Sequence, residues 1–231
     1  MRFPKLMHDE HIYSIFVRSR YLSGQMFIST QRFFEINDIK YHWFRSQVPL
    51  CSNLQSVIQR LEPDRTKQFA LRMAHTPLAP WLLSIPENAS YEVLKSSGNR
   101  NNLEENPFSI DRRWKFCPNC AENELKDKGF SYWHSTHQSL GALVCHSHDT
   151  LLHSHDELRY LDFTLPHHWL EKSTALNCSE PWKLDWQPFI YNLTSHIHDH
   201  HEWPITIKRS IKAHLGIEGK IKFKAKPIFD E

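Results

Sequence analysis

The sequence predicts a mainly α-helical protein with one small metal-binding ribbon in its middle. Apolar residues recur at helical spacing in several short stretches of the first 75 residues. Residues 116–152 carry two Cys/His pairs with 24 residues between them, which is a spacing that favours a compact metal-held ribbon. With 231 residues, the chain is long enough to bury a real core as one domain or two small ones.

Two short helices are expected in the first forty residues. The first presents one apolar face and stops at Gly24; the face consists of Ile12, Ile15, Phe16, Ser19 and Leu22. The second begins with Thr30 as its N-cap and buries Phe33 and Phe34.

Two further helices are expected on either side of Pro63. Ser52 and Gln55 form a possible capping box at the start of the first. Its apolar positions are Leu54, Val57, Ile58 and Leu61. Asp64 can cap the next helix, which carries Phe69, Leu71 and Met73.

The polar stretch at residues 95–109 predicts a boundary between regions. We therefore expect a helical N-terminal region at 1–103, a zinc-ribbon region at 104–165 and a helical C-terminal region with a basic tail at 166–231. A connector is expected after the metal segment, followed by helices around 187–198 and 206–216.

The composition argues against a membrane or secreted protein. No apolar run is long enough for a membrane span, and the first residues lack the apolar core of a signal peptide. The five cysteines fit a disulfide framework poorly because their number is odd. We expect Cys51 and Cys178 to be free thiols in a reducing, cytoplasmic compartment.

The net charge of +2 is unevenly distributed along the chain. Residues 1–116 hold 16 basic and 11 acidic side chains, residues 117–204 hold 5 and 12, and residues 205–231 hold 7 and 3. Basic ends can meet phosphate, whereas an acidic middle would be repelled by it. Chance surface decoration is the alternative explanation.

The central segment predicts one structural zinc ion. Cys117 and Cys120 offer two sulfurs from one tight turn, and Cys145 with His148 completes a Cys₃His set. Four protein ligands leave no open position for water, so the site would be structural. The residues between the pairs suffice for a strand, a turn and a return. His146 is the nearest rival to His148, and His134 and His137 are weaker rivals.

The segment resembles the zinc-binding motif of the TniQ/TnsD family of transposition target-site selectors. The matching residues are Cys117-Pro118-Asn119-Cys120, Tyr132-Trp133-His134, His137-Gln138, Gly141, Val144-Cys145, His148 and Leu151-Leu152. "HDEHIYSIFVRSRYLSGQMFIST" is similar to the family's N-terminal helix and turn. "RMAHTPLAPWL" resembles the TnsD branch, so the chain looks closest to the amino-terminal part of TnsD.

The resemblance implies an adaptor rather than an enzyme. It implies a helix-turn-helix-like N-terminal region, binding to double-stranded target DNA, and recruitment of a TnsC-type transposition ATPase and the transposase. A bacterial cytoplasmic protein is implied, associated with the nucleoid when bound to DNA. The alternative within the family is a CRISPR-associated TniQ held by a guide-RNA effector complex. The chain is shorter than usual for TnsD, and a second set of Cys pairs is lacking.

Candidate DNA-binding residues lie before the metal motif and near the C-terminus. They are Arg112, Arg113, Lys115, Lys208, Arg209, Lys212, Lys220 and Lys222. Such side chains position a protein on phosphates without reading the sequence. A solvated turn and a solvated tail are the alternatives.

Residues 196–201 suggest a second metal site, because His196 and His200 share a helical face. A zinc-dependent hydrolase using the His196–His201 cluster is therefore the rival from another functional class. A histidine-rich surface helix is the simpler explanation. We expect Trp133 to pack as a core residue rather than stack on a base.

Overall fold

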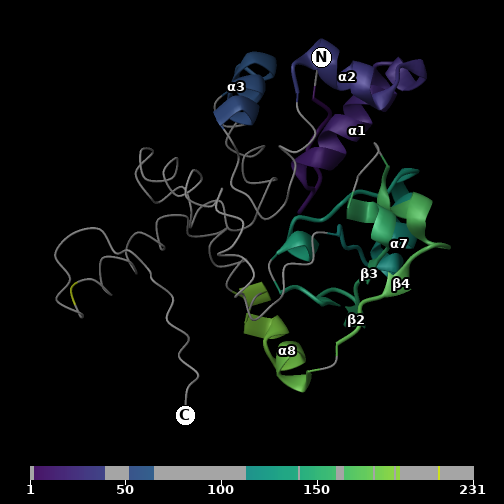
Figure 1. The fold of residues 1–231 in the computed structure, drawn as a ribbon, viewed down its shortest axis with the longest axis vertical. Coiled ribbons are helices and arrows are strands. Elements are labelled where there is room, and N and C mark those ends of the chain that lie inside the picture. The colour runs from purple at the N-terminus through teal and green to yellow at the C-terminus, as the bar shows by residue number, and fades with distance from the viewer. Residues whose placement is uncertain are drawn as a thin grey trace.

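A computed structural model describes residues 3–39, 52–64, 113–139, 141–159, 164–178, 180–189, 191–192 and 213. About half of these residues lie in helices, and the strands form two antiparallel pairs. Figure 1 shows α1 and α2 at one end of the molecule, with α3 near them and the metal-motif region below α1. None of the described helices is long and apolar enough to cross a membrane.

Helix α1 (Ile12–Leu22) forms where the sequence predicts it. The imidazole of its N-cap, His11, accepts a hydrogen bond from the amide of Tyr13. The helix ends at Ser23, followed by Gly24 in the left-handed region with φ of 68°. Every residue from Ile12 to Ser19 is buried, whereas Leu22, in the last turn, is 74% exposed. The expectation that Leu22 faces the core is therefore wrong.

Helix α2 (Thr30–Asn37) buries Phe33 and Phe34, as predicted. Its N-cap is Ser29 rather than Thr30, since the Ser29 hydroxyl accepts a hydrogen bond from the amide of Arg32 at 3.2 Å. Ser29 precedes Thr30 directly, and the helix takes the earlier of two residues that can both cap it.

Helix α3 (Ser52–Leu61) also confirms its prediction, with Leu54, Val57 and Ile58 buried and Leu61 packed at the edge of the core. With Ser52 as the N-cap, the helix would begin at residue 53. It begins at Ser52 instead. The capping-box side chains lie outside the described part of the structure.

The second half of the described chain begins with α7 (Pro118–Lys128). Four strands follow: β1 (Val144–Cys145), β2 (Thr150–Leu151), β3 (His153–Ser154) and β4 (Thr174–Ala175). β1 pairs with β2 and β3 with β4, with Cys145 opposite Thr150 and Ser154 opposite Thr174. The remaining elements are η1 (Gln25–Phe27), η4 (Thr136–Gln138), η5 (Asp156–Arg159), η6 (Pro166–Trp169) and α8 (Pro181–Asp185).

Helix α7 occupies the first part of the stretch between the two ligand pairs, which is long enough for a strand, a turn and a return. Pro118 occupies the first turn, where a missing N–H costs nothing, and Gly129 ends the helix with φ of 76°. The first ligand pair therefore stands at a helix N-terminus and only the second on a hairpin. The zinc-ribbon description of this region is not confirmed.

One core joins the N-terminal helices to the metal-motif region. Buried residues of α1, α2 and α3 form a single cluster with Trp114, Phe116, Trp133, Leu158 and Trp169. Trp133 is fully buried, as expected, and its ring meets those of Trp114 and Phe116 edge-on. The cluster contains residues from all three predicted regions, and the β3–β4 pair spans the predicted boundary at residue 165.

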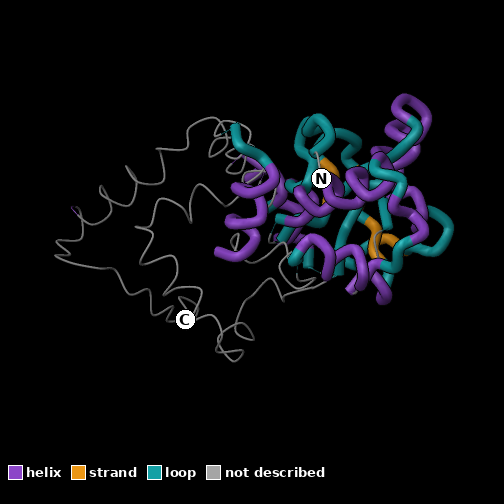
Figure 2. Tube along the Cα trace, turned by 90° about the horizontal axis from the view of Figure 1, so that it is seen from above, coloured by secondary structure: helices purple, strands orange, loops and turns teal. Residues whose placement is uncertain are grey.

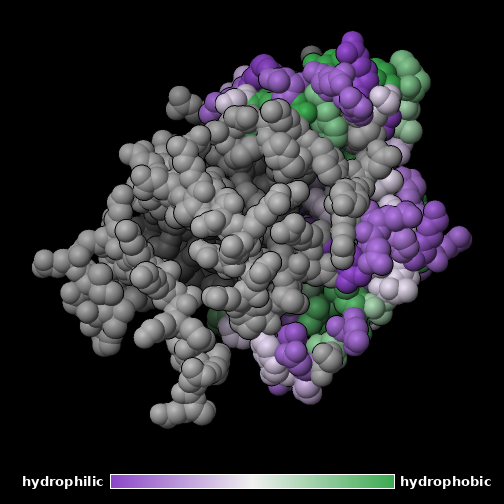
Figure 3. All heavy atoms as spheres, viewed as in Figure 1, coloured by the Kyte–Doolittle hydropathy of each residue, from purple (hydrophilic) through white to green (hydrophobic). Residues whose placement is uncertain are grey.

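Figure 2 shows the short strands enclosed among helices and loops. Apolar side chains are exposed around the end of α1 and α2, where Figure 3 shows hydrophobic surface in green. The large ones there are Tyr21, Leu22, Met26, Phe27 and Ile36.

Several expectations lie outside the described residues. These are the helix with Phe69, Leu71 and Met73, the boundary stretch at 95–109, the helix at 206–216 apart from Ala213, and most of the helix around 187–198. The expected connector after the metal motif instead contains η6 and β4.

Candidate metal centre

The structure brings all four predicted metal ligands together. Cys117 is the N-cap of α7 and Cys120 lies in its first turn, while Cys145 ends β1 and His148 lies in the turn before β2. The ligand atoms of the four residues all lie within 4.8 Å of one another, and the three cysteines are buried. Among the described residues, no other group of His, Cys, Asp or Glu is arranged to hold a metal ion.

The distances fit tetrahedral coordination. His148 Nδ1 lies 3.6, 3.3 and 3.6 Å from the sulfurs of Cys117, Cys120 and Cys145. Cys120 Sγ lies 3.7 Å from Cys145 Sγ. Zinc–ligand bonds of the usual length give tetrahedron edges of about 3.8 Å between sulfurs and about 3.5 Å between sulfur and nitrogen. These four distances match a tetrahedral site, and the four ligand atoms together could hold a metal ion.

Neighbouring groups orient these ligands. Asn123 Nδ2 lies 3.3 Å from His148 Nε2, on the side of the ring away from the sulfurs, and turning the amide over would place Oδ1 there. An amide oxygen there would accept the Nε2–H and leave Nδ1 free to bind a metal. Asp149 adopts the left-handed region with φ of 50°, and its amide donates to the Cys145 carbonyl at 2.8 Å. This contact closes the turn that carries His148.

The thiols influence one another's protonation because their sulfurs are so close. Hydrogen bonds from Cys120 and Cys145 lower the pKa of Cys117. The same contact with Cys117 raises the pKa of Cys120 and of Cys145. A bound cation would favour the thiolate form of all three cysteines.

The three rival histidines do not belong to the group. His146 is exposed and stacks on Tyr191, with ring centroids 3.9 Å apart. His137 is 2% exposed and packs against His134. The equal spacing of the two pairs thus selects the histidine that lies with the three cysteines.

His134 instead belongs to an N-terminal clamp, formed by Asp9, Glu124, His134 and Thr136. Its Nδ1 lies 3.2 Å from Asp9 Oδ2, and its Nε2 lies 2.7 Å from Glu124 Oε1. Asp9 also accepts hydrogen bonds from the amide and hydroxyl of Thr136. The clamp ties the residues before α1 to α7 and η4.

Backbone contacts reinforce the clamp. The amide of His11 donates to the Trp133 carbonyl at 2.7 Å, and the amide of Ser135 donates to the Asp9 carbonyl at 2.8 Å. The amide of Trp133 donates to the Ser14 hydroxyl at 2.7 Å. Residues 9–14 and residues 133–135 are therefore joined by hydrogen bonds, although more than 100 residues separate them in the sequence.

The clamp is electrostatically strong. Burial lowers the pKa of His134, but the hydrogen bonds and charges of Asp9 and Glu124 outweigh burial and raise it to about 9. Burial raises the pKa of Asp9, yet the hydrogen bond and charge of His134 leave it below its usual value. At neutral pH, the clamp therefore consists of an imidazolium beside the Asp9 carboxylate.

A second buried ion pair lies next to the clamp. Arg18 on α1 donates to Glu10 Oε2 at 2.6 Å and to the Lys5 carbonyl at 3.2 Å. Burial raises the pKa of Glu10, while Arg18 opposes that rise. Neither ion pair is predicted from the sequence, where the only hint is the resemblance to the family's N-terminal "DE" helix.

Two of the predicted phosphate-binding residues, Arg113 and Lys115, lie in different surroundings. Arg113 pairs with Asp156 at 3.1 Å, in a partly exposed position. Lys115 is 7% exposed, and its ammonium donates to the carbonyls of Ser139 and Ala142 at 3.2 and 2.8 Å. Lys115 is therefore a structural residue, because both its burial and these bonds keep it from a phosphate.

Several candidate residues lie outside the described part of the chain. They are Arg112, Lys208, Arg209, Lys212, Lys220, Lys222, Cys51 and the His196–His201 cluster. Cys178 is described and is a free thiol, as expected.

A family model described as TniQ matches residues 1–152. The matched range includes α1, α2, α3, the N-terminal clamp and all four residues of the candidate metal centre. No curated protein and no solved structure matches the chain.

Proposed function

The chain belongs to the TniQ family, and from that premise we propose that it is a target-selection adaptor in DNA transposition. In this role it binds double-stranded target DNA and recruits a TnsC-type ATPase, which then engages the transposase. The observation that carries the proposal is the family match, which extends over the N-terminal helices and the metal motif together. The role requires binding surfaces and no turnover.

The metal centre would hold one zinc ion as a structural element. Three sulfurs and one imidazole nitrogen suit zinc, and the spacing of the four ligand atoms supports tetrahedral coordination. With four protein ligands, the ion would have no open position for a substrate. Its contribution would be to hold the start of α7 against the β1–β2 hairpin.

Base reading is assigned to the N-terminal helices, as a helix-turn-helix-like module. Helix α3 is the best-suited recognition helix because residues 52–61 contain no acidic side chain, whereas α2 contains Glu35. Gln59 and Arg60 are exposed on α3, and Arg60 also pairs with Asp38. A glutamine can read adenine in the major groove.

The basic C-terminal residues would add affinity without specificity, as Lys and Arg side chains do on phosphates. The acidic middle of the chain would then remain free to recruit the ATPase. Arg113 is a weaker candidate than these residues, since Asp156 already neutralises it.

A DNA-binding titration tests the proposal. We expect the zinc-loaded full chain to bind a duplex of the host attachment site more tightly than a scrambled duplex, with affinity falling steeply between 50 and 200 mM salt, as is typical of phosphate contacts. Gln59→Ala should reduce the preference between the duplexes, and Lys220→Gln with Lys222→Gln should weaken binding to both. Absence of DNA binding at low salt would reject direct recognition and support a TniQ carried by a guide-RNA effector.

A further inference from the structure

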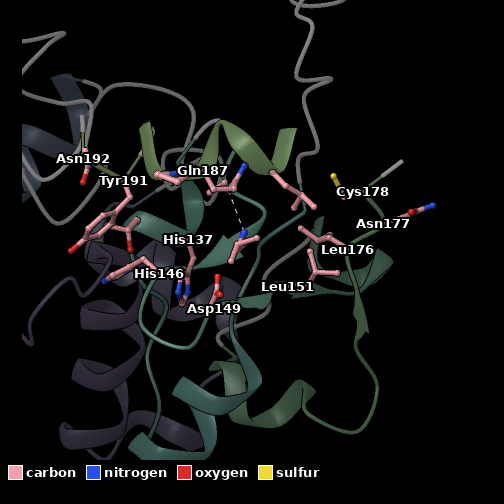
Figure 4. Close-up of a pocket in the computed structure, with 15 residues that line it drawn as sticks. His137, His146, Asp149, Leu151, Leu176, Asn177, Cys178, Gln187, Tyr191 and Asn192 are labelled. Carbon is pink, nitrogen blue, oxygen red and sulfur yellow. Dashed lines mark hydrogen bonds between the residues drawn. The ribbon is translucent and has the colours of Figure 1, made fainter. Parts of the chain in front are cut away.

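A pocket of about 730 Å³ lies beside the candidate metal centre. Its walls come from the β1–β2 hairpin, the end of β4 and the chain around α8. Figure 4 shows Tyr191 beside His146 at one end and Leu151 with Leu176 at the other, with Gln187 between them on the α8 side. None of the roles proposed above uses this pocket.

Gln187 fixes the α8 wall in place. Its Oε1 accepts hydrogen bonds from the amides of Leu143 and Val144 at 2.7 and 3.3 Å. Its Nε2 donates to the carbonyls of Gly141 and Lys183 at 2.9 and 2.7 Å. Since the whole amide is engaged, the pocket is built into the fold rather than left by a loosely placed segment.

The pocket combines an apolar wall with one acidic group. Leu151 and Leu184 are 36% and 42% exposed, and Leu176 lies deeper. Of the described residues that line the pocket, Asp149 is the one that carries a formal charge, and none is Lys or Arg. Asp149 is exposed at the rim, and Asp185 on α8 is exposed as well.

His137 also lines the pocket and provides a polar group that the roles proposed above do not use. It is 2% exposed, and its Nδ1 has no hydrogen-bond partner among the described residues. Burial, together with the charge on His134, lowers its pKa well below the usual value. The Nδ1 of a neutral imidazole in this position can form one hydrogen bond with a bound ligand. A buried polar atom without such a partner costs free energy.

We propose that this pocket is a docking site for a short peptide segment of the recruited ATPase, in which a Lys or Arg side chain stands next to an apolar residue. The apolar residue and the aliphatic part of the basic side chain would pack on the leucines, and the cation would meet Asp149. The charge balance of residues 117–204, with 5 basic and 12 acidic side chains, favours a basic partner and disfavours nucleic acid.

The identity of the partner rests on the proposed function, but the chemistry of the pocket does not. The first test therefore selects peptides from a phage-displayed library of random 12-residue sequences, using the zinc-loaded full chain. We expect the enriched peptides to place Lys or Arg beside an apolar residue. Peptides enriched without a basic residue would overturn the proposal.

Matched variants test the site with one enriched synthetic peptide. Leu184→Ser should weaken binding about tenfold by removing apolar contact, and Asp149→Asn about threefold by removing an exposed charge. Asparagine tolerates the left-handed backbone at position 149. The controls, Leu125→Ser and Asp127→Asn, change exposed residues of α7 that do not line the pocket. Unchanged affinity in both pocket variants would also overturn the proposal.

Capture of the purified ATPase without DNA tests the partner. Leu184→Ser should reduce capture about tenfold, and Leu125→Ser should leave it unchanged. If the variant loses the peptide but keeps the ATPase, the assigned partner is wrong. DNA affinity should be equal in all four variants, so a failure of DNA binding would count against the proposed function and not against the pocket.

Discussion

His134 shows how one side chain can hold two distant parts of this protein together. It lies between the carboxylates of Asp9 and Glu124, 125 and 10 residues away in the sequence. Both ring nitrogens are engaged, so the residue is unavailable to a metal. An imidazole that must be charged to complete a contact makes that contact sensitive to pH.

The first prediction concerns this pH dependence. Because the folded pKa of His134, about 9, lies above the unfolded value of 6.5, its stabilisation is fully present below pH 6.5 and is lost as the pH rises through 9. The parent should lose on the order of 2–3 kcal/mol more unfolding free energy than His134→Gln over that range. Urea unfolding at a series of pH values measures the difference, since pH effects at the metal centre are common to both proteins. Equal losses would refute the charged clamp.

A second prediction isolates the charge of Asp9. Asp9 has a positive φ of 56°, which asparagine tolerates, so Asp9→Asn keeps the backbone and removes the carboxylate. We expect destabilisation of about 1–3 kcal/mol and a fall in the pKa of His134 toward its usual value. Imidazole chemical shifts recorded against pH would report the second effect. Asp38→Asn, at an exposed left-handed position, is the matched control.

At the scale of elements, residue spacing along the chain was enough to predict helices and metal ligands. Most of the features that it did not predict depend on contacts between residues far apart in the sequence. The periodicity of Leu54, Val57 and Ile58 was enough to place α3, and the matched intervals around Cys117 and Cys145 were enough to select His148. Lys115 looked like a phosphate contact because its burial depends on the carbonyls of Ser139 and Ala142, which no local pattern reveals. Helix α7 could have been found from Pro118 and Gly129, which mark its two ends.

The third prediction concerns α7 and the β1–β2 hairpin, which meet at the metal centre. Cys120→Ser should lose zinc, and amide exchange should rise most in residues 117–128 and 143–152. Residues 12–19 should be affected less, because they belong to the larger apolar cluster rather than to the small one that contains Cys117, Cys120 and Cys145. Hydrogen-exchange mass spectrometry with metal analysis measures both effects. Cys178→Ser should keep zinc, and full zinc in Cys120→Ser would refute the ligand assignment.

At the scale of the whole molecule, the N-terminal helices and the metal centre are parts of one packed unit. Trp133 joins the two parts through three contacts. Its ring lies in the shared core, its amide donates to the Ser14 hydroxyl, and its carbonyl accepts from the His11 amide. Under the proposed function, such a unit would hold the DNA-binding surface and the partner-binding surface in a fixed relative geometry. Rigid placement of two binding surfaces is what an adaptor requires.

Mapping transposon insertions tests target selection by this protein, because the insertion sites report target choice itself. Cells supplied with the transposase and the ATPase would be compared with and without this protein, and insertion sites would be counted by sequencing. We expect insertions to concentrate at the selected target only when the protein is present, and Cys120→Ser and Leu184→Ser to reduce them. An unchanged distribution of insertions in its absence would contradict target selection by this chain.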